Sequence, residues 1–419
     1  CTNRIPPRCG IPHQHRRSST RRIFKFLVER LSLKVSMFAL AFSLITNCDA
    51  SVNTLFPVPK TIEFALNQKQ PQLALAPDFA VVVAEGIECD VLSSAASRYT
   101  TMIQKAMMPP AAGTTLIHTL VLASKDTTAT LAPGVSVAYT LTVGASVATA
   151  SGSTSFGALY AVETFAQFVE GEASFAAVTI TDEPEFEHRG LTVDSGRRYA
   201  PIPLVKSIID GLSYTKMNVL HLGITGPAVR VEIAALPELT EHLEVGQFYT
   251  AGEVADIISY ARLRGVRIVP EFDVPAHASG LWPLAGTRAL QFCDDHRTTL
   301  RGDDATTIGL VNEIFDAIVA LFPDEVVHVG GDETCPHGLC PDACTFAAVN
   351  NAERAFQERL VETHKRRPMG WNEIWSEGAA TPNGALPELI IQNWKGAGDA
   401  ETVDAGFATG EVFFITAYN

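Results

Sequence analysis

The feature that most restricts the fold of this chain is a repeated alternation of short apolar stretches and amphipathic stretches, which starts near residue 187. The apolar stretches are expected to be strands, at residues 190–194, 218–225, 266–273, 326–329, 368–373, 389–395 and 411–416. Strands that alternate with helices pair in parallel, and about seven such units predict a (β/α)8 barrel. We therefore expect an α/β protein with a TIM-type barrel over residues 186–419, truncated after about seven strands.

Two of the intervening helices carry clear end signals. Residues 250–253 read TAGE, a capping box that starts a helix, and Gly265 is expected to end that helix. Apolar residues then recur at helical spacing from Ile308 to Phe322, and Pro323 follows them. Both signals support helices between the predicted strands.

Residues 51–185 predict a smaller α+β domain ahead of the barrel. Strands are expected at residues 79–83, 116–123 and 137–143, and helices at residues 89–107 and 156–169. In the second helix the apolar residues recur at a spacing that places them in one stripe, and we expect this stripe to pack on a sheet. Nothing in this part of the sequence suggests catalysis, so we expect the domain to pack against the barrel.

The first 50 residues differ in composition from the rest of the chain. Residues 1–36 contain nine Lys/Arg and a single acid, Glu29, and are expected to form a basic leader of low order, or to be an artefact of the assigned gene start if Met37 is the true first residue. Residues 37–50 read MFALAFSLITNCDA, and their short apolar core before small residues predicts a secretory signal peptide. A signal anchor or a disordered leader is the alternative. With the signal removed, we expect no membrane span and a secreted, lysosomal or vacuolar protein.

Charge limits the partners of the protein. The formal net charge is −14, and the basic residues of the leader lie ahead of the predicted cleavage point. The exported part is therefore more acidic than the whole, and no basic groove for nucleic acid is expected.

Four cysteines lie around the central strand, at positions 293, 335, 340 and 344. In an oxidising compartment cysteines of this kind pair, and we expect Cys293 to form a disulfide with one of the other three. A zinc site that includes His337 is the alternative, but no pair of C-x-x-C motifs supports it, so no metal is expected.

Carboxylates follow several of the predicted strands, and two of them are adjacent. Residues 326–333 read VVHVGGDE, so a buried strand is followed by two glycines and then by Asp332 and Glu333. Polar residues at the corresponding ends of the strands are Asp194, Asp273, Asp332, Glu333, Glu373 and Lys395. In a barrel these ends share one face, where active sites lie. The simpler interpretation is an acidic helix N-terminus, where carboxylates offset the helix dipole.

Paired acids with different tasks are what glycoside hydrolysis requires. One carboxyl group holds a proton and gives it to the leaving oxygen, while the other stays charged beside the developing positive charge. The two glycines suit a sharp turn or the close approach of a ligand.

Several strand ends, taken together, resemble those of the β-N-acetylhexosaminidases of glycoside hydrolase family 20. The matching stretches are HRGLTVD at 188–194, KMNVLH at 216–221, PEFDVPAH at 270–277, HVGGDE at 328–333 and GWNE at 370–373. FPVPK at 56–60 and FGALYAVETF at 156–165 are similar to the smaller domain of that family. The resemblance covers roughly residues 55–419 and implies a retaining mechanism in which the substrate's own 2-acetamido oxygen attacks C1.

The resemblance also implies roles for individual residues. Glu333 would be the general acid and then the base, and Asp332 would hold the acetamido nitrogen; a charged Asp332 would help Glu333 to keep its proton. Asp273 would orient His277, and His277 would contact Glu333. Further residues are expected to bind substrate (Arg189, Trp371, Trp394 and Tyr418) or to support the site from behind (Asp194 and His328).

Two departures from the family pattern define the alternative functions. After His221 the family usually has a second His and then one or two Asp, where this chain has Gly223 and Gly226. An eighth strand and the residues it carries are also not found before Asn419. We expect an exo-acting enzyme that removes terminal GlcNAc or GalNAc from glycans or chitooligosaccharides without a cofactor; a homodimer is compatible with this class. The alternatives are an impaired or inactive carbohydrate-binding relative, and a glycosidase in which Asp332 itself attacks the sugar.

Overall fold

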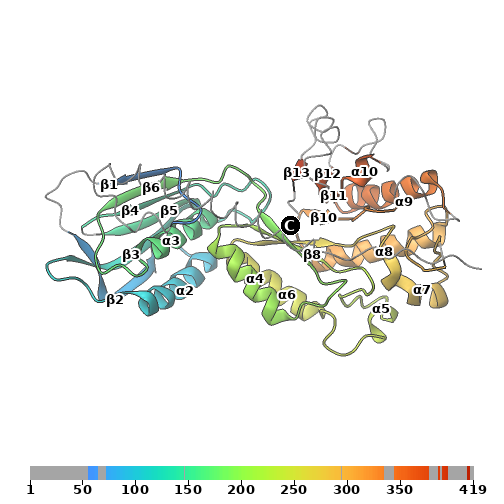
Figure 1. Cartoon of the computed structure of the whole chain (residues 1–419), viewed down its shortest axis with the longest axis horizontal. Coiled ribbons are helices and arrows are strands. Elements are labelled where there is room, and N and C mark those ends of the chain that lie inside the picture. The colour runs from blue at the N-terminus through green and yellow to red at the C-terminus, as the bar shows by residue number, and fades with distance from the viewer. Residues whose placement is uncertain are drawn as a thin grey trace, which may run out of the picture. The chain divides into compact units, whose positions relative to one another are not determined.

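The computed structural model describes residues 55–64, 72–145, 147–293, 295–334, 344–376, 386, 389–394 and 413–415. Two sheets lie within this part of the chain, one in the smaller N-terminal domain and one in the barrel domain (Figure 1). Among the described residues, no helix is long and apolar enough to cross a membrane.

The smaller domain is a six-stranded mixed sheet with two helices. Its strands are β1 (Thr61–Phe64), β2 (Leu73–Val83), β3 (Thr115–Asp126), β4 (Tyr139–Val143), β5 (Ala148–Thr154) and β6 (Val178–Asp182), in the order β1-β6-β4-β5-β3-β2. The helices α2 (Asp90–Ala106) and α3 (Ser155–Val169) lie on the same face of this sheet (Figure 1). The α+β domain expected from the sequence is therefore present.

Helix α3 is buried on nearly all sides, which differs from the single stripe expected. The apolar residues of the stripe, such as Leu159 and Phe165, belong to the core of the smaller domain. Residues of α3 outside the stripe, such as Ala158 and Ala161, are buried as well, and Leu263, which follows a barrel helix, packs into the same core. A helix enclosed by two layers needs apolar residues all round.

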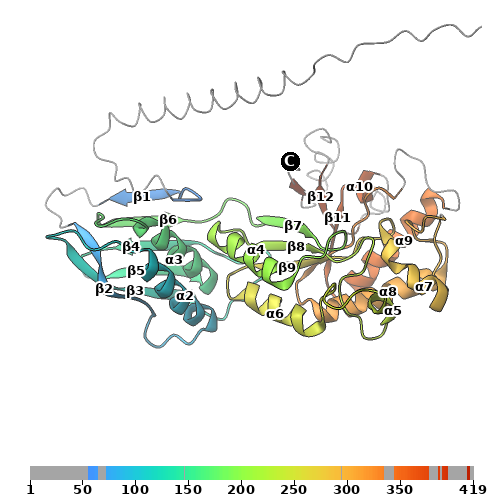
Figure 2. The same cartoon turned by 60° about the horizontal axis from the view of Figure 1, so that its bottom comes forward.

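The barrel domain contains seven parallel strands that pair in chain order. They are β7 (Gly190–Asp194), β8 (Val219–Gly223), β9 (Arg267–Glu271), β10 (Val326–His328), β11 (Arg367–Trp371), β12 (Ile390–Asn393) and β13 (Phe413–Ile415). The larger connecting helices are α4 (Ile202–Tyr214), α6 (Ala251–Arg262), α8 (Ala305–Leu321) and α9 (Phe346–Glu358), and successive ones lie side by side along the sheet (Figure 2). Shorter helical segments are α5 (Glu238–Glu241), η2 (Ala278–Leu281), α7 (Trp282–Thr287), η4 (Arg359–Thr363) and α10 (Glu373–Ser376). This is the TIM-type arrangement expected, and the predicted capping box of Thr250 and Glu253 is present at the start of α6.

The inner side of the barrel sheet is layered, because side chains of a strand alternate between its two faces. The lowest layer is an apolar cluster of Val219, Val269, Val326, Met369 and Ile390, one from each of five neighbouring strands. Two residues further along, the same strands carry His221, Glu271, His328, Trp371 and Gln392, all of them buried. The core therefore changes from apolar to polar toward the carboxyl ends of the strands.

A disulfide joins Cys293 to Cys344, which confirms that Cys293 pairs with one of the three later cysteines. Cys335, Cys340 and His337 lie outside the described residues. The bridge connects the segment after α7 to the segment just before α9, and the two cysteines are 51 positions apart in the sequence.

Removing this disulfide should destabilise the protein by about 4 kcal/mol, because a loop of this length is costly to close in the unfolded chain. We expect the double variant Cys293→Ser/Cys344→Ser to unfold at lower denaturant concentration than the wild type. Cys89→Ser is the control, since Cys89 is a free cysteine in the smaller domain. Equal midpoints for the double variant and the wild type under oxidising conditions would contradict the assignment.

Candidate active site

A cavity of about 220 Å³ opens at the carboxyl ends of the barrel strands. The described residues that line it are Thr192, Asp194, Arg197, Gly223, Thr225, Glu271, Asp273, Asp332, Glu333, Trp371 and Trp394. Pockets for drug-sized ligands usually have roughly 300–1,000 Å³. The smaller volume suits one sugar ring better than an extended oligosaccharide.

Asp332 and Glu333 reach this cavity together, directly after β10, and contact the same imidazole. His277 Nε2 lies 3.4 Å from Asp332 Oδ2 and 3.3 Å from Glu333 Oε2. The Asp332 side chain is 14% exposed and that of Glu333 is 52% exposed, so one acid lies inside the cavity and the other at its rim. The two acids therefore have the different surroundings that a divided task requires.

The backbone of two of these contacting residues, Glu333 and His277, is in the left-handed region. Glu333 has φ 53° and His277 has φ 50°, values that residues with side chains adopt rarely. Such conformations cost free energy and are concentrated at functional sites, where surrounding structure holds them.

The glycines before Asp332 form the expected sharp turn, with φ 76° at Gly330 and φ 86° at Gly331. The atoms that come close to these two glycines belong to the protein itself, whereas the sequence suggested the approach of a ligand. A Cβ on Gly330 would lie 2.5 Å from the Asp273 Cα, and one on Gly331 would lie 2.3 Å from the Ile374 side chain.

Gly330→Ala should therefore destabilise the fold by roughly 2–4 kcal/mol, from overpacking together with left-handed strain. Gly211→Ala, in α4 with no atom within 4 Å of the added Cβ, is the matched control and should stabilise the helix slightly. Denaturant unfolding of both variants tests this; a Gly330→Ala midpoint at or above the wild-type value would disprove it.

Asp273 is buried beside Asp332, which changes the role predicted for it. Its Oδ1 accepts a hydrogen bond from the Gly331 amide at 3.3 Å, and its own amide donates to the Thr225 hydroxyl at 2.7 Å. Burial raises the pKa of Asp273 well above its usual value, and the neighbouring Asp332 raises it further. The sequence predicts that Asp273 orients His277, but the carboxylate that contacts His277 is that of Asp332. Asp332 also raises the pKa of His277.

Asp332 has one oxygen, Oδ1, that could accept a hydrogen bond from a ligand. Its Oδ1 is buried and, among the described residues, has no hydrogen-bond donor. A buried acceptor without a donor is costly, so its retention in a cavity favours a ligand that supplies an N–H or O–H group.

Both predicted tryptophans line the cavity and are oriented by carboxylates. The Trp371 Nε1 donates to Glu271 Oε1 at 2.8 Å. The Trp394 Nε1 donates to Glu373 at 3.0 Å. Each indole has its polar edge satisfied by the protein, which leaves an aromatic ring for contact with an apolar group or sugar face.

Arg189 lies outside this group of residues, so the structure does not support its predicted role in substrate binding. It precedes β7, at the opposite end of the strand from the cavity, and donates to the Lys216 carbonyl at 3.0 Å and to the Tyr160 hydroxyl at 2.7 Å. The arginine at the cavity is Arg197, which donates to Asp194 at 2.6 Å. Tyr418 and Lys395 lie outside the described residues.

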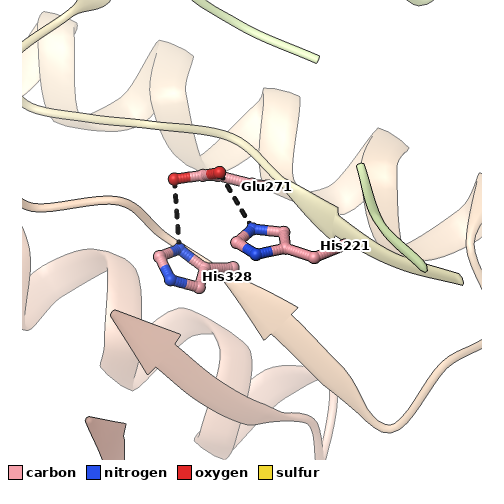
Figure 3. Close-up of side chains that lie close together, drawn as sticks. All are labelled: His221, Glu271 and His328. Carbon is pink, nitrogen blue, oxygen red and sulfur yellow. Dashed lines mark ion pairs between the residues drawn. The ribbon is translucent and has the colours of Figure 1, made fainter. Parts of the chain in front are cut away.

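Sequence reasoning missed two members of the polar layer at the base of the cavity, His221 and Glu271, and Glu271 is also one of the lining residues. His221 Nε2 lies 2.8 Å from Glu271 Oε2, and His328 Nδ1 lies 3.4 Å from Glu271 Oε1 (Figure 3). The imidazoles stack with ring centroids 4.6 Å apart. The sequence does contain a signal for these residues. Side chains alternate between the two faces along β8, β9 and β10, and each of these residues lies two positions after an apolar residue of the inner face.

The charges of this layer follow from its burial. Burial would raise the pKa of Glu271, but the facing imidazoles of His328 and His221 outweigh it and lower that pKa. Burial lowers the pKa of His328 to about 3, so His328 is neutral at neutral pH. Its Nδ1 accepts the Gly330 amide hydrogen at 3.0 Å. Although His221, Glu271 and His328 bring three potential metal ligands within 4.8 Å of one another, they are already engaged as a hydrogen-bonding and charged cluster.

Gly223 leaves part of the cavity open next to this layer. A Cβ at this position would lie 3.4 Å from the Asp194 Cα and 3.6 Å from Glu271 Oε2, which are ordinary contacts. The position thus has room for a Cβ atom, and Gly223 and Glu271 both line the cavity. Gly226 differs, because its φ of 150° suits glycine and it packs against Arg197.

Two family models match the chain. The model of the glycosyl hydrolase family 20 catalytic domain matches residues 186–413, and the model of domain 2 of that family matches residues 53–183.

Curated relatives are β-hexosaminidase subunits. The chain is 28% identical over 364 residues to β-hexosaminidase subunit A2 of Dictyostelium discoideum, in a match that covers 80% of this chain and 65% of the relative. It is 31% identical over 305 residues to the human β-hexosaminidase subunit beta, covering 67% of this chain and 54% of the relative. The matches thus span between about half and two thirds of these relatives' length.

Several solved structures have a similar fold. The chitobiase of Flavobacterium johnsoniae superposes with a TM-score of 0.73 at 23% identity, over 88% of this chain and 60% of that protein. The β-N-acetylhexosaminidase of Streptomyces coelicolor A3(2) gives 0.67 at 20% identity, over 87% of this chain and 75% of that protein. Because the match to the catalytic-domain model alone covers more than half of the sequence, the chain belongs to glycosyl hydrolase family 20.

Proposed function

We propose that this protein is an exo-acting β-N-acetylhexosaminidase, which removes terminal GlcNAc or GalNAc by substrate-assisted retaining catalysis. The observation that carries the proposal is the buried Oδ1 of Asp332, which has no donor in the described part of the chain and lies in a cavity for a single sugar, beside Glu333 at the rim. An acetamido N–H is a donor that satisfies this acceptor. Membership of the family supports the same activity.

The arrangement divides the chemical work between the two acids. Asp332 accepts the acetamido N–H and so directs the acetamido oxygen toward C1, while its charge stabilises the cationic character of the transition state. Glu333, at the more accessible rim, protonates the leaving oxygen and then activates water. Trp371 and Trp394 provide the apolar surface for the acetamido methyl and the sugar face.

The test is hydrolysis of an aryl N-acetyl-β-glucosaminide, with and without a thiazoline analogue of the cyclised intermediate. We expect product release and tight inhibition, because analogues of the transition state bind far more tightly than substrate. Sugar binding without product release would support the carbohydrate-binding alternative. Release without thiazoline inhibition would favour attack by Asp332 itself.

We also propose that the protein is exported, with glycans or chitooligosaccharides as substrates. The apolar segment at residues 37–50 supports export, and the disulfide Cys293–Cys344 is typical of an oxidising compartment. Fusion of residues 37–50 to a reporter tests the signal, and retention of the fusion inside the cell would contradict export.

A further inference from the structure

Glu271 is the residue around which the buried polar layer is organised, and nothing in the proposed mechanism uses it. It lies at the carboxyl end of β9, with His221 on β8 to one side and His328 on β10 to the other. Figure 3 shows each imidazole directing a nitrogen toward a different oxygen of its carboxylate. Its Oε1 also accepts the indole hydrogen of Trp371 on β11. One carboxylate thus connects four neighbouring strands.

The hydrogen atoms in this cluster can be placed from the contacts. His328 Nδ1 already accepts the Gly330 amide hydrogen, so it presents a lone pair and gives Glu271 no proton. His221 Nε2, at 2.8 Å from Glu271 Oε2, must carry a proton, since two lone pairs would repel at that distance. The other ring nitrogen of His221, Nδ1, lies 3.1 Å from the Thr192 hydroxyl, so both nitrogens of this ring have a polar partner.

Glu271 also holds the indole of Trp371, an aromatic ring that lines the substrate cavity. A charged acceptor makes a stronger hydrogen bond than a neutral one, and the 2.8 Å contact is buried. The ring centroids of His328 and Trp371 lie 4.8 Å apart, with the ring planes at 59°, so the His328 imidazole also packs against the indole. An aromatic side chain held by both a hydrogen bond and a ring contact has little freedom to move.

We propose that Glu271 is a positioning residue for hydrolysis: by accepting the Trp371 indole hydrogen it fixes the ring against the substrate's acetamido group. The inference rests on the proposed function, in which that ring contacts the acetamido methyl. The acetamido oxygen is the nucleophile, so a displaced ring misplaces the attacking atom. A misplacement of about 1 Å costs on the order of 100-fold in rate.

The experiment is a double-mutant cycle with Glu271→Leu and Trp371→Phe, assayed with aryl glycosides that carry N-acetyl or the bulkier N-propionyl. Each single variant should lose about 10- to 100-fold in kcat/KM, mainly through kcat, and the double variant should lose little more than either. The preference for N-acetyl over N-propionyl should shrink in all three. Additive losses, or lower activity with an unchanged acyl preference, would overturn the proposal.

Two further variants separate positioning from a merely structural role. Glu271→Gln keeps an acceptor for the indole and should retain activity within roughly fivefold of the wild type, with the acyl preference preserved. Glu163→Gln removes another buried carboxylate, which accepts the Tyr99 hydroxyl at 2.7 Å in the smaller domain; it should lower stability without changing acyl preference. If Glu271→Leu does not fold, Glu271→Met takes its place in the cycle, because it is close to Glu in size and has no oxygen to accept the indole hydrogen. A folded Glu271→Met with unchanged acyl preference would overturn the proposal.

Failure of the proposed function has a different signature. If the proposed function is wrong, the wild-type protein itself will hydrolyse neither glycoside. The inference is then tested by binding of N-acetyl- and N-propionylglucosamine and by the nuclear magnetic resonance signal of the Trp371 indole hydrogen. That signal should shift strongly in Glu271→Leu and less in Glu271→Gln, which keeps a neutral acceptor, and an unshifted signal in Glu271→Leu would overturn the inference.

Discussion

Glu333→Gln is expected to lower kcat by about 1,000-fold or more for substrates with a poor leaving group, while sugar binding stays measurable. The amide keeps the size of the side chain but has no acidic proton for the leaving oxygen and cannot act as a base. The need for protonation increases with the basicity of the leaving oxygen. We therefore expect a much smaller loss with a dinitrophenyl glycoside than with a chitooligosaccharide.

The leaving-group series distinguishes this role from structural damage. A variant that is partly unfolded would lose the same factor with every leaving group. Glu313→Gln, an exposed acid on α8, is the control and should leave kcat unchanged. A loss from Glu333→Gln that is small, or equal for all leaving groups, would remove Glu333 from the role of general acid.

The overall fold could be predicted because it depends on local signals that agree with one another. Strand β7 has the bounds expected from its apolar run, and α6 begins at the expected capping box. Strand β5 was missed, since its sequence ATASGST has small and hydroxyl-bearing residues where strands usually have β-branched or aromatic ones. Its pairing with β3 and β4 determines its conformation, and this pairing depends on distant parts of the chain.

The candidate site was predictable to the level of which strand ends meet, but not to the level of individual contacts. Asp332 and Glu333 could be placed at the cavity because parallel strands bring their carboxyl ends to one face. The position of Arg189 away from the cavity could not be foreseen, because it depends on hydrogen bonds to Tyr160 of the smaller domain and to the Lys216 carbonyl. Likewise, the contact of Asp273 with Asp332 depends on how closely Gly330 approaches Asp273 in three dimensions.

Asp332→Asn is expected to lower kcat by about 100-fold, less than Glu333→Gln, and to weaken binding of the thiazoline analogue. The amide can still accept the acetamido N–H if it is suitably oriented, but it no longer supplies a negative charge beside the developing cation. Activity of the variant within a few-fold of wild type would show that the charge of Asp332 is not used.

The same substitution should make stability less dependent on pH. Asp273 has a pKa raised by folding, through burial and then through Asp332, so wild-type stability falls as the pH rises above the unfolded-state value of about 3.9. His277 has a pKa raised mainly by Asp332, so its stabilising contribution is complete below about pH 6.5 and is lost as the pH rises through its folded-state pKa.

Asparagine removes the part of both shifts that comes from Asp332, and the two effects have the same sign. The stability of Asp332→Asn relative to wild type should therefore increase steadily between about pH 5 and pH 8. Denaturant unfolding of both proteins across this range measures the difference. In the wild type, Asp273 and Asp332 lie close together and repel each other when both are charged. The substitution removes this repulsion, so the variant should be less active and yet gain relative stability as the pH rises. A difference that is constant or falls with pH would show that Asp273 and His277 do not sense the charge of Asp332.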